Sequence, residues 1–116
     1  MGVLDVVKIE AYIRHDVLGP LRQALAAEGL PSMSVAEAYG TVLDRRGRWA
    51  VRPRLRLEMV VQREDAEVAL GLLAEHARTG RRGDGLVTVL PVEDAIRVRT
   101  TQRGREVLIS HTGLDA

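Results

Sequence analysis

The sequence predicts an α+β fold whose strands and helices follow in the order βαββαβ. Segments in which apolar and polar residues alternate, as in strands, flank two segments with apolar residues every three or four positions, as in helices. The chain has 116 residues, near the commonest size of one domain, so a single domain over residues 1–116 is expected. Hydrophobic residues make up 46% of the chain and none is Phe, so the core must consist mainly of aliphatic side chains.

The first half of the chain supplies a strand, a helix and a second strand. Residues 6–13 alternate in polarity and are rich in β-branched side chains, which predicts a strand. A helix then begins at Gly19-Pro20, because a proline in the first turn loses no hydrogen bond, and it ends at Gly29. Residues 32–40 again have strand character. Together these elements form one βαβ half of the predicted fold.

The second half repeats this order. Residues 55–61 alternate as a strand, and Glu64 and Asp65 place negative charge at the start of a helix, where the helix dipole favours it. A strand follows at residues 86–90, and extended structure resumes at residues 96–99. The complete order is that of the ferredoxin-like fold, an antiparallel sheet with both helices on one face.

Basic charge is concentrated in one segment of the chain. The net charge is +1, yet residues 44–54 contain five arginines and one acidic residue, a local balance of +4 that leaves −3 for the remainder. Such a segment is expected at the surface, and the acidic balance elsewhere argues against a general nucleic-acid binder.

The composition also argues against several kinds of site. The chain has no cysteine, so it forms no disulfides and no thiolate metal sites. His15, His76 and His111 show no metal-ligand spacing with one another or with carboxylates, so no metal site is predicted. No apolar run is long enough for a membrane span and the start does not resemble a leader, so a cytoplasmic protein is expected.

Residues 41–53 are expected to form the longest irregular stretch, which in so small a domain is usually functional or mobile. The segment contains Arg45, Arg46, Arg48, Trp49 and Arg52. One interpretation is a short solvated β-ribbon with Trp49 partly packed. The other is a target-docking surface, since Trp and Arg are typical interface anchors.

Residues 79–85 (TGRRGDG) hold three glycines and two arginines in seven positions. One interpretation is a turn that ends the second helix, because Gly and Asp adopt positive φ at low cost. The other is an anion cradle, because exposed backbone N–H groups beside arginines attract negative charge. Both interpretations remain open from these residues alone.

Four segments stand in an order and spacing that suggest a family. They are Lys8-Ile9-Glu10-Ala11 with Arg14, Met33-Ser34-Val35 before Tyr39-Gly40, residues 79–85, and residues 91–100 (PVEDAIRVRT). With these segments the chain resembles the PII signal-transduction proteins over roughly residues 7–106. The combination is specific, whereas the glycine-rich segment alone would not be.

The resemblance implies a homotrimer of ferredoxin-like subunits that binds an adenine nucleotide (ADP, AMP or ATP) in the clefts between neighbours. It implies a PII-like core at about residues 6–100, a T-loop at residues 41–53 and a C-terminal tail at residues 101–116. In the family the T-loop changes conformation with ligand and docks on a target enzyme or transporter. Members are regulators rather than enzymes, and a membrane role comes only through a transporter partner.

The resemblance also implies which residues bind the nucleotide. They are Ser34, Gly40, Glu58, Val60, Gly83, Asp84, Gly85, Arg97 and Arg99. In Gly83-Asp84-Gly85, backbone N–H groups are expected to approach the phosphates because no Cβ intervenes at the glycines. Arg97 and Arg99, two residues apart on an expected strand, would share one face and clamp phosphate oxygens. Arg54, Arg81 and Arg82 are further candidates for phosphate or anion contacts.

Leu86 follows the glycine-rich segment where the family typically has a lysine directed at the phosphates. Losing a charge-assisted contact costs about 1.5–3 kcal/mol, and the loss falls hardest on a triphosphate. The sequence therefore predicts that ADP or AMP is preferred over ATP.

The T-loop equivalent also departs from the family. It is about nine residues shorter, has no tyrosine that could be nucleotidylated, and lacks the glutamine that helps to bind Mg²⁺ and 2-oxoglutarate. Thr41-Val42 replaces the usual aromatic-glycine pair at its base, and Arg54 replaces a lysine that meets the 2-oxoglutarate carboxylate. These differences argue against 2-oxoglutarate sensing through a bound metal.

The sequence thus favours a PII-like regulator that controls an unidentified target protein through a short loop containing Arg45, Arg46, Arg48, Trp49 and Arg52. Its role would lie in carbon or bicarbonate handling or in transport. One alternative is a nitrogen regulator that senses ATP and 2-oxoglutarate. An alternative of another class is a structural or CutA-like trimer with a vestigial nucleotide site.

Overall fold

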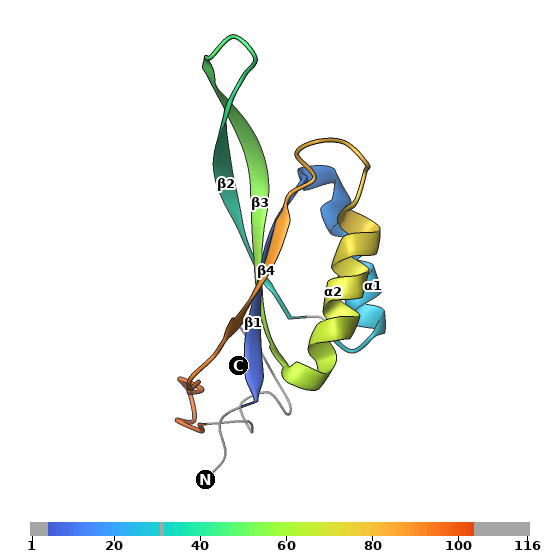
Figure 1. The fold of residues 1–116 in the computed structure, drawn as a ribbon. Coiled ribbons are helices and arrows are strands. Elements are labelled where there is room, and N and C mark those ends of the chain that lie inside the picture. Colours follow the sequence, from blue (N-terminus) through green and yellow to red (C-terminus); the bar gives the residue numbers. More distant parts are fainter. Residues whose placement is uncertain (1–4, 31, 104–116) are drawn as a thin grey trace.

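The computed structural model describes residues 5–30 and 32–103. The elements in chain order are β1 (Val6–Ile13), the 3₁₀ turn η1 (His15–Val17), α1 (Leu18–Ala27), β2 (Ser34–Leu43), β3 (Trp49–Gln62), α2 (Arg63–Ala77) and β4 (Leu86–Pro91). The strands form one sheet in the order β2-β3-β1-β4, and every neighbouring pair is antiparallel. Both helices lie on one face of this sheet (Figure 1). The predicted ferredoxin-like α+β fold is confirmed.

The ends of α1 follow from local chemistry. Pro20 lies in the first turn, where no backbone donor is lost. At the other end Gly29 has φ +76°, and the N–H of Leu30 donates to the Leu25 carbonyl at 2.9 Å. This left-handed closure satisfies carbonyls that would otherwise lack partners, so the helix ends close to the predicted glycine.

The core lies between the two helices and the face of the sheet that they cover. Its strand residues alternate along β1 and β3, and its helix residues follow the helical period. The buried apolar side chains are Val6, Val7, Ile9, Ala11, Ile13, Val17, Leu21, Leu25, Leu55, Leu57, Met59, Val61, Ala66, Ala69, Leu73 and Ala77. The core is therefore aliphatic, as the composition requires.

The predicted irregular stretch at residues 41–53 is instead regular. β2 and β3 pair without interruption from Ser34 opposite Glu58 to Leu43 opposite Trp49. The β-ribbon interpretation is correct in shape, but Trp49 is 74% exposed and is not packed against the domain. We call residues 39–53 the ribbon. Pairing across the two strands supplies the order that neither strand's residues suggest alone.

The ribbon turn is held by Asp44. Its Oδ1 accepts hydrogen bonds from the N–H groups of Arg46 (2.8 Å) and Arg48 (2.9 Å), and its carbonyl accepts one from Gly47. The Arg48 Nε lies 3.4 Å from Asp44 Oδ2. A short turn with these contacts gives the ribbon a defined tip.

The predicted strand at residues 96–99 is wrong. β4 ends at Pro91, and residues 98–100 form a turn. Ile96 bridges to Arg103, and the N–H of Thr101 donates to the Arg97 carbonyl at 2.7 Å. Alternating polarity did not produce a sheet strand here, because the segment pairs with its own chain a few residues on. The expected C-terminal tail lies outside the described residues from residue 104 onward, as does His111.

Candidate functional site

The glycine-rich segment between α2 and β4 is organised around Asp84. Its Oδ2 accepts hydrogen bonds from the backbone N–H of Thr79 (2.7 Å) and of Gly80 (2.9 Å), and its Oδ1 accepts one from the Thr79 hydroxyl. Arg14, at the end of β1, places its Nε 3.1 Å from the same Oδ1. One carboxylate thus closes the segment on itself and ties it to the sheet.

These contacts hold the pKa of Asp84 well below its ordinary value. The largest cause is the hydrogen bond from the Thr79 hydroxyl, and the Thr79 backbone, Arg14 and the Gly80 backbone add to it against a partial desolvation. All of these donors stabilise the ionised form. Asp84 is therefore ionised at neutral pH, and its carboxylate oxygens accept hydrogen bonds from the loop.

Two arginines from the sheet bind carbonyls of the segment. The Arg14 Nη2 donates to the Arg82 carbonyl at 2.7 Å. The Arg54 Nε, from β3 at the base of the ribbon, donates to the Gly83 carbonyl at 3.0 Å. Asp84 offsets the charge of Arg14, whereas Arg54 adds a positive charge beside the loop that attracts anions.

The two glycines beside Asp84 are required for reasons that the sequence did not reveal. At Gly83 (φ +91°) a Cβ would lie 2.6 Å from the Arg54 Nη2, and at Gly85 (φ +113°) it would collide with the Tyr12 carbonyl oxygen. The space that a Cβ would fill is occupied by the chain's own atoms. The missing Cβ atoms thus admit Arg54 and the β1 backbone, and the expected approach of the loop N–H groups to a nucleotide stays a prediction.

The remaining candidate contacts lie on the sheet face that the helices leave uncovered. Ser34 is paired with Glu58, and Val60 is paired with Lys8. Glu58 Oε2 lies 3.6 Å from the Lys8 Nζ, so its charge is already balanced within the sheet. Gly40 lies at the base of the ribbon, opposite Arg52.

Arg97 and Arg99 do not share a strand face. The Arg97 side chain is 5% exposed and its Nη1 lies 3.4 Å from Gln102 Oε1, whereas Arg99 is exposed in the turn. They follow the far end of β4 from the glycine-rich segment (Figure 1). A six-residue strand spans roughly 20 Å. Within one subunit these arginines therefore cannot reach a phosphate held at Gly83.

The other loop arginines are exposed. The Arg81 Nε donates to the Thr79 hydroxyl at 3.3 Å, and Arg82 contributes its carbonyl to Arg14. The ribbon arginines lie at the turn and along β3, with Arg52 paired opposite Gly40. Sequence reasoning did not assign a role to Thr79 or Arg14, although both belong to the segments that suggested the family.

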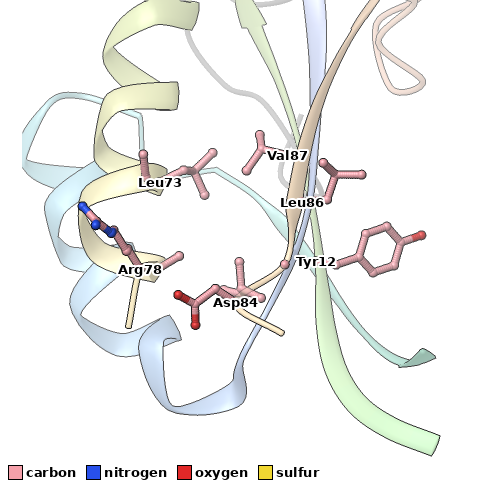
Figure 2. Close-up of a pocket in the computed structure, with 10 residues that line it drawn as sticks. Tyr12, Leu73, Arg78, Asp84, Leu86 and Val87 are labelled. Carbon is pink, nitrogen blue, oxygen red and sulfur yellow. The ribbon is translucent and has the colours of Figure 1, made fainter. Parts of the chain in front are cut away.

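A pocket opens next to Asp84. Figure 2 shows Leu73 and Val87 on the side of α2, while Tyr12 and Leu86 project from the opposite side of the sheet. The pocket is lined by residues of β1, of α2, of the loop after α2 and of the start of β4: Tyr12, Ile13, Leu73, Ala74, Ala77, Arg78, Asp84, Gly85, Leu86 and Val87. The pocket is mostly apolar, and Asp84 and Arg78 give it charge.

Within residues 5–30 and 32–103, no group of His, Asp and Glu side chains gathers in a way that could hold a metal ion. In the same part of the chain no helix has the length and hydropathy needed to cross a membrane.

Comparisons with known proteins identify the family. The family model "Nitrogen regulatory protein P-II" matches residues 6–102. The P-II protein of Rhodospirillum rubrum is 36% identical over 110 residues, which cover 87% of this chain and 98% of that one. The P-II 1 protein of Methanothermobacter thermautotrophicus is 34% identical, with 87% and 96% covered.

Solved structures of PII proteins also resemble this chain. Arabidopsis thaliana PII bound to citrate superposes with a TM-score of 0.77 at 33% identity and covers 88% of each chain. A GlnK–ATP complex of B. subtilis superposes with a TM-score of 0.79 at 26% identity, covering 87% of this chain and 95% of that one. The chain belongs to the P-II family of nitrogen regulatory proteins, which are signalling regulators and not enzymes.

Proposed function

We propose that this PII regulator binds an adenine nucleotide between the subunits of a cytoplasmic homotrimer, prefers ADP or AMP to ATP, and controls a target protein through its Arg/Trp ribbon. PII proteins are trimers that bind small effectors and act on target proteins. The related B. subtilis protein has been solved with ATP. The proposal extends this behaviour to the residues of the present chain.

The observation that carries the proposal is the glycine-rich loop held by Asp84, with two guanidiniums beside it. Arg14 and Arg54 both donate to carbonyls of this loop, so the loop is fixed in shape and positively flanked before any ligand arrives. A preformed site of this kind loses little conformational entropy when an anion binds.

The position of Arg97 and Arg99 supports a site between subunits. Because they lie beyond the far end of β4, phosphate contacts from them must go to a neighbouring subunit. The Arg97 backbone is hydrogen-bonded within its own turn, and its side chain contacts Gln102. A change of the side-chain conformation alone would therefore let Arg97 contact a phosphate bound by the neighbouring subunit. The site would then combine one subunit's loop with the next subunit's arginines.

Leu86 supports the preference for fewer phosphates. Its side chain is 65% exposed at the start of β4, where the loop ends. A leucine there offers no donor to a terminal phosphate, and the missing charge-assisted contact corresponds to roughly a tenfold to hundredfold loss of affinity. ADP and AMP have no third phosphate, so they would lose less binding affinity than ATP through the absence of this contact.

Arg54 supports coupling between the nucleotide and the ribbon. It belongs to β3 at the ribbon base, and its Nε is bound to the Gly83 carbonyl at 3.0 Å while its Nη1 is bound to the Pro53 carbonyl at 2.7 Å. A phosphate at the loop would compete for this guanidinium. Occupancy would then favour one arrangement of the ribbon base, as far as that arrangement binds nucleotide better.

The shortened ribbon and the missing glutamine favour a role in transport or in carbon or bicarbonate handling. The alternative is a nitrogen regulator that senses ATP and 2-oxoglutarate. One observation favours it: the Nη2 atoms of Arg14 and Arg54 both converge on Gly83, 3.4 and 2.6 Å from where its Cβ would lie. Such a pair of guanidiniums could hold a dicarboxylate.

Calorimetric titration of the purified trimer with AMP, ADP and ATP tests the proposal. We expect ADP or AMP to bind more tightly than ATP, and Leu86→Lys to strengthen ATP binding by roughly tenfold or more. Leu90→Lys is the matched control, because Leu90 lies on the same face of β4 and is also exposed. It should leave both affinities unchanged.

ATP binding at least tenfold tighter than ADP by the native chain would contradict the preference. Enhancement of ATP binding by 2-oxoglutarate would establish the alternative instead. If no adenine nucleotide bound at all, the nucleotide proposal would be wrong and a vestigial site would remain.

A further inference from the structure

One face of the ribbon is apolar and uncovered. The register pairs Tyr39 with Pro53, Thr41 with Val51 and Leu43 with Trp49. Directly paired residues share a face, so these side chains all lie on the same side. Tyr39, Leu43, Trp49 and Val51 are 70%, 58%, 74% and 57% exposed, and we call these four the apolar ribbon face.

This face continues the core side of the sheet beyond the helices. Leu55 and Leu57 are buried, and alternate positions nearer the turn keep the same orientation. The His15 Nε2 lies 3.1 Å from Glu37 Oε2, joining the start of η1 to β2 at the residue paired with Leu55. Past this contact the ribbon projects away from the helices (Figure 1). Its apolar side chains are thus placed like core residues but remain exposed.

The opposite face of the ribbon carries small side chains and a basic one. Gly40 is paired with Arg52, and Val42 with Ala50. A glycine opposite Arg52 leaves that side chain room to extend across β2 toward the edge of the sheet. Arg45, Arg46 and Arg48 add charge at the turn, and the only acidic residue of the ribbon, Asp44, is engaged by Arg48 and the turn.

The ribbon also has an open edge. In the sheet order β2-β3-β1-β4, β2 is an outer strand and pairs only with β3 among the described strands. Every second residue of such a strand directs its backbone N–H and C=O away from the sheet. These groups can pair with one further strand.

We propose that β2 of the ribbon binds an extended segment of a partner protein in which apolar and acidic residues alternate. This inference rests on the proposed function, since it assumes that the ribbon contacts the regulated partner. The added strand would pair with the backbone of β2. Its apolar residues would join the apolar ribbon face, and its acidic residues would face Arg52 and the turn arginines.

The open edge favours a protein over a lipid surface. Inserting the ribbon into hydrocarbon would leave the outer N–H and C=O groups of β2 without partners, at a cost of several kcal/mol for each. A strand from a protein satisfies them. The acidic balance of the chain outside residues 44–54 argues against nucleic acid, because it repels phosphates.

Selection of a displayed random-peptide library on the full-length protein, with ADP present, tests the inference. We expect the selected peptides to alternate apolar and acidic residues. A synthetic peptide of the selected sequence should shift the emission of Trp49, the only tryptophan of the chain, and slow amide hydrogen exchange in residues 38–42. Its binding should weaken with added salt, because charge pairs at an exposed edge are screened.

Two variants of neighbouring residues provide a matched comparison. Leu43→Thr removes an aliphatic side chain from the apolar ribbon face, and Val42→Thr makes a similar change on the opposite face. Thr is favourable in strands, so both variants should keep the ribbon. We expect Leu43→Thr to weaken peptide binding by roughly tenfold, as for an interface anchor, and Val42→Thr to change it little.

Selected peptides without acidic residues, or equal binding by the native and Leu43→Thr proteins, would overturn the inference. So would a Trp49 shift with phosphatidylglycerol vesicles or with a single-stranded oligonucleotide when the peptides give none. ADP titration of the same samples separates the two proposals. ADP binding without peptide binding contradicts only this inference, and peptide binding without nucleotide binding contradicts only the nucleotide function.

Discussion

Arg54 Nε donates to the Gly83 carbonyl across a distance of 3.0 Å, which joins the base of the ribbon directly to the glycine-rich loop. The two residues lie 29 positions apart in the sequence. A change at the loop therefore reaches β3 through one side chain, and the contact is a physical basis for communication between a nucleotide and the ribbon.

Replacing Arg54 should weaken that communication. In Arg54→Gln we expect ADP to produce a much smaller change in Trp49 fluorescence quenching than in the native protein, because the donor to Gly83 is shortened and uncharged. Arg52→Gln is the control, since the side-chain contact described for Arg52 is to the adjacent Val51 carbonyl. An undiminished ADP response in Arg54→Gln, measured at saturating ADP, would show that the coupling runs elsewhere.

Gly85 should tolerate no side chain. At φ +113° a Cβ would strike the Tyr12 backbone, so Gly85→Ala must displace the loop or β1. We expect a loss of about 3 kcal/mol or more in the free energy of unfolding, or failure to fold. Gly80→Ala, at φ +83° but with open space around its Cβ position, should cost only about 1 kcal/mol. Denaturant unfolding at equal subunit concentration compares them, and equal losses would contradict the close approach to Tyr12.

Asp84 should make stability depend on pH in the acid range. Its pKa is lowered in the folded state, so folding favours the ionised carboxylate. The contribution is fully present well above the unfolded pKa of about 3.9 and is lost as the pH falls toward the lower folded pKa. The stability difference between native and Asp84→Asn proteins should therefore shrink on acidification from neutral pH. A difference that stays constant down to acid unfolding would exclude this role.

Much of the fold could be predicted because local patterns and tertiary packing agree. Residues 6–13 alternate in polarity and lie at the centre of the sheet, and Gly29 ends α1 because only a left-handed residue closes it easily. The β-ribbon was only one of two interpretations of residues 41–53, because Gly40 and Pro53 weaken the strand pattern there, and pairing across the strands stabilises it. The opposite error occurred at residues 96–99. Apolar and basic residues alternate there as in a strand, but within the described residues the segment is not part of a sheet strand.

The site was predictable only in part, for a similar reason. The glycine-rich segment and the family could be recognised from residues close together in sequence, and the family is confirmed. The contacts of Arg14 with Asp84 and of Arg54 with Gly83 join residues 70 and 29 positions apart. No spacing rule predicts them, because they depend on how β1 and β3 lie beside the loop. The assignment of nucleotide contacts remains a prediction.

Titration of ADP into the native protein and into the Arg97→Ala/Arg99→Ala double variant tests the proposed site most directly. If the glycine-rich loop of one subunit and the arginines of the next hold the phosphates together, the double variant should bind ADP at least about tenfold more weakly. Arg103→Ala controls for disturbance of the same turn, since Arg103 pairs with Asp94. Unchanged ADP affinity in a folded, trimeric double variant would contradict the assignment.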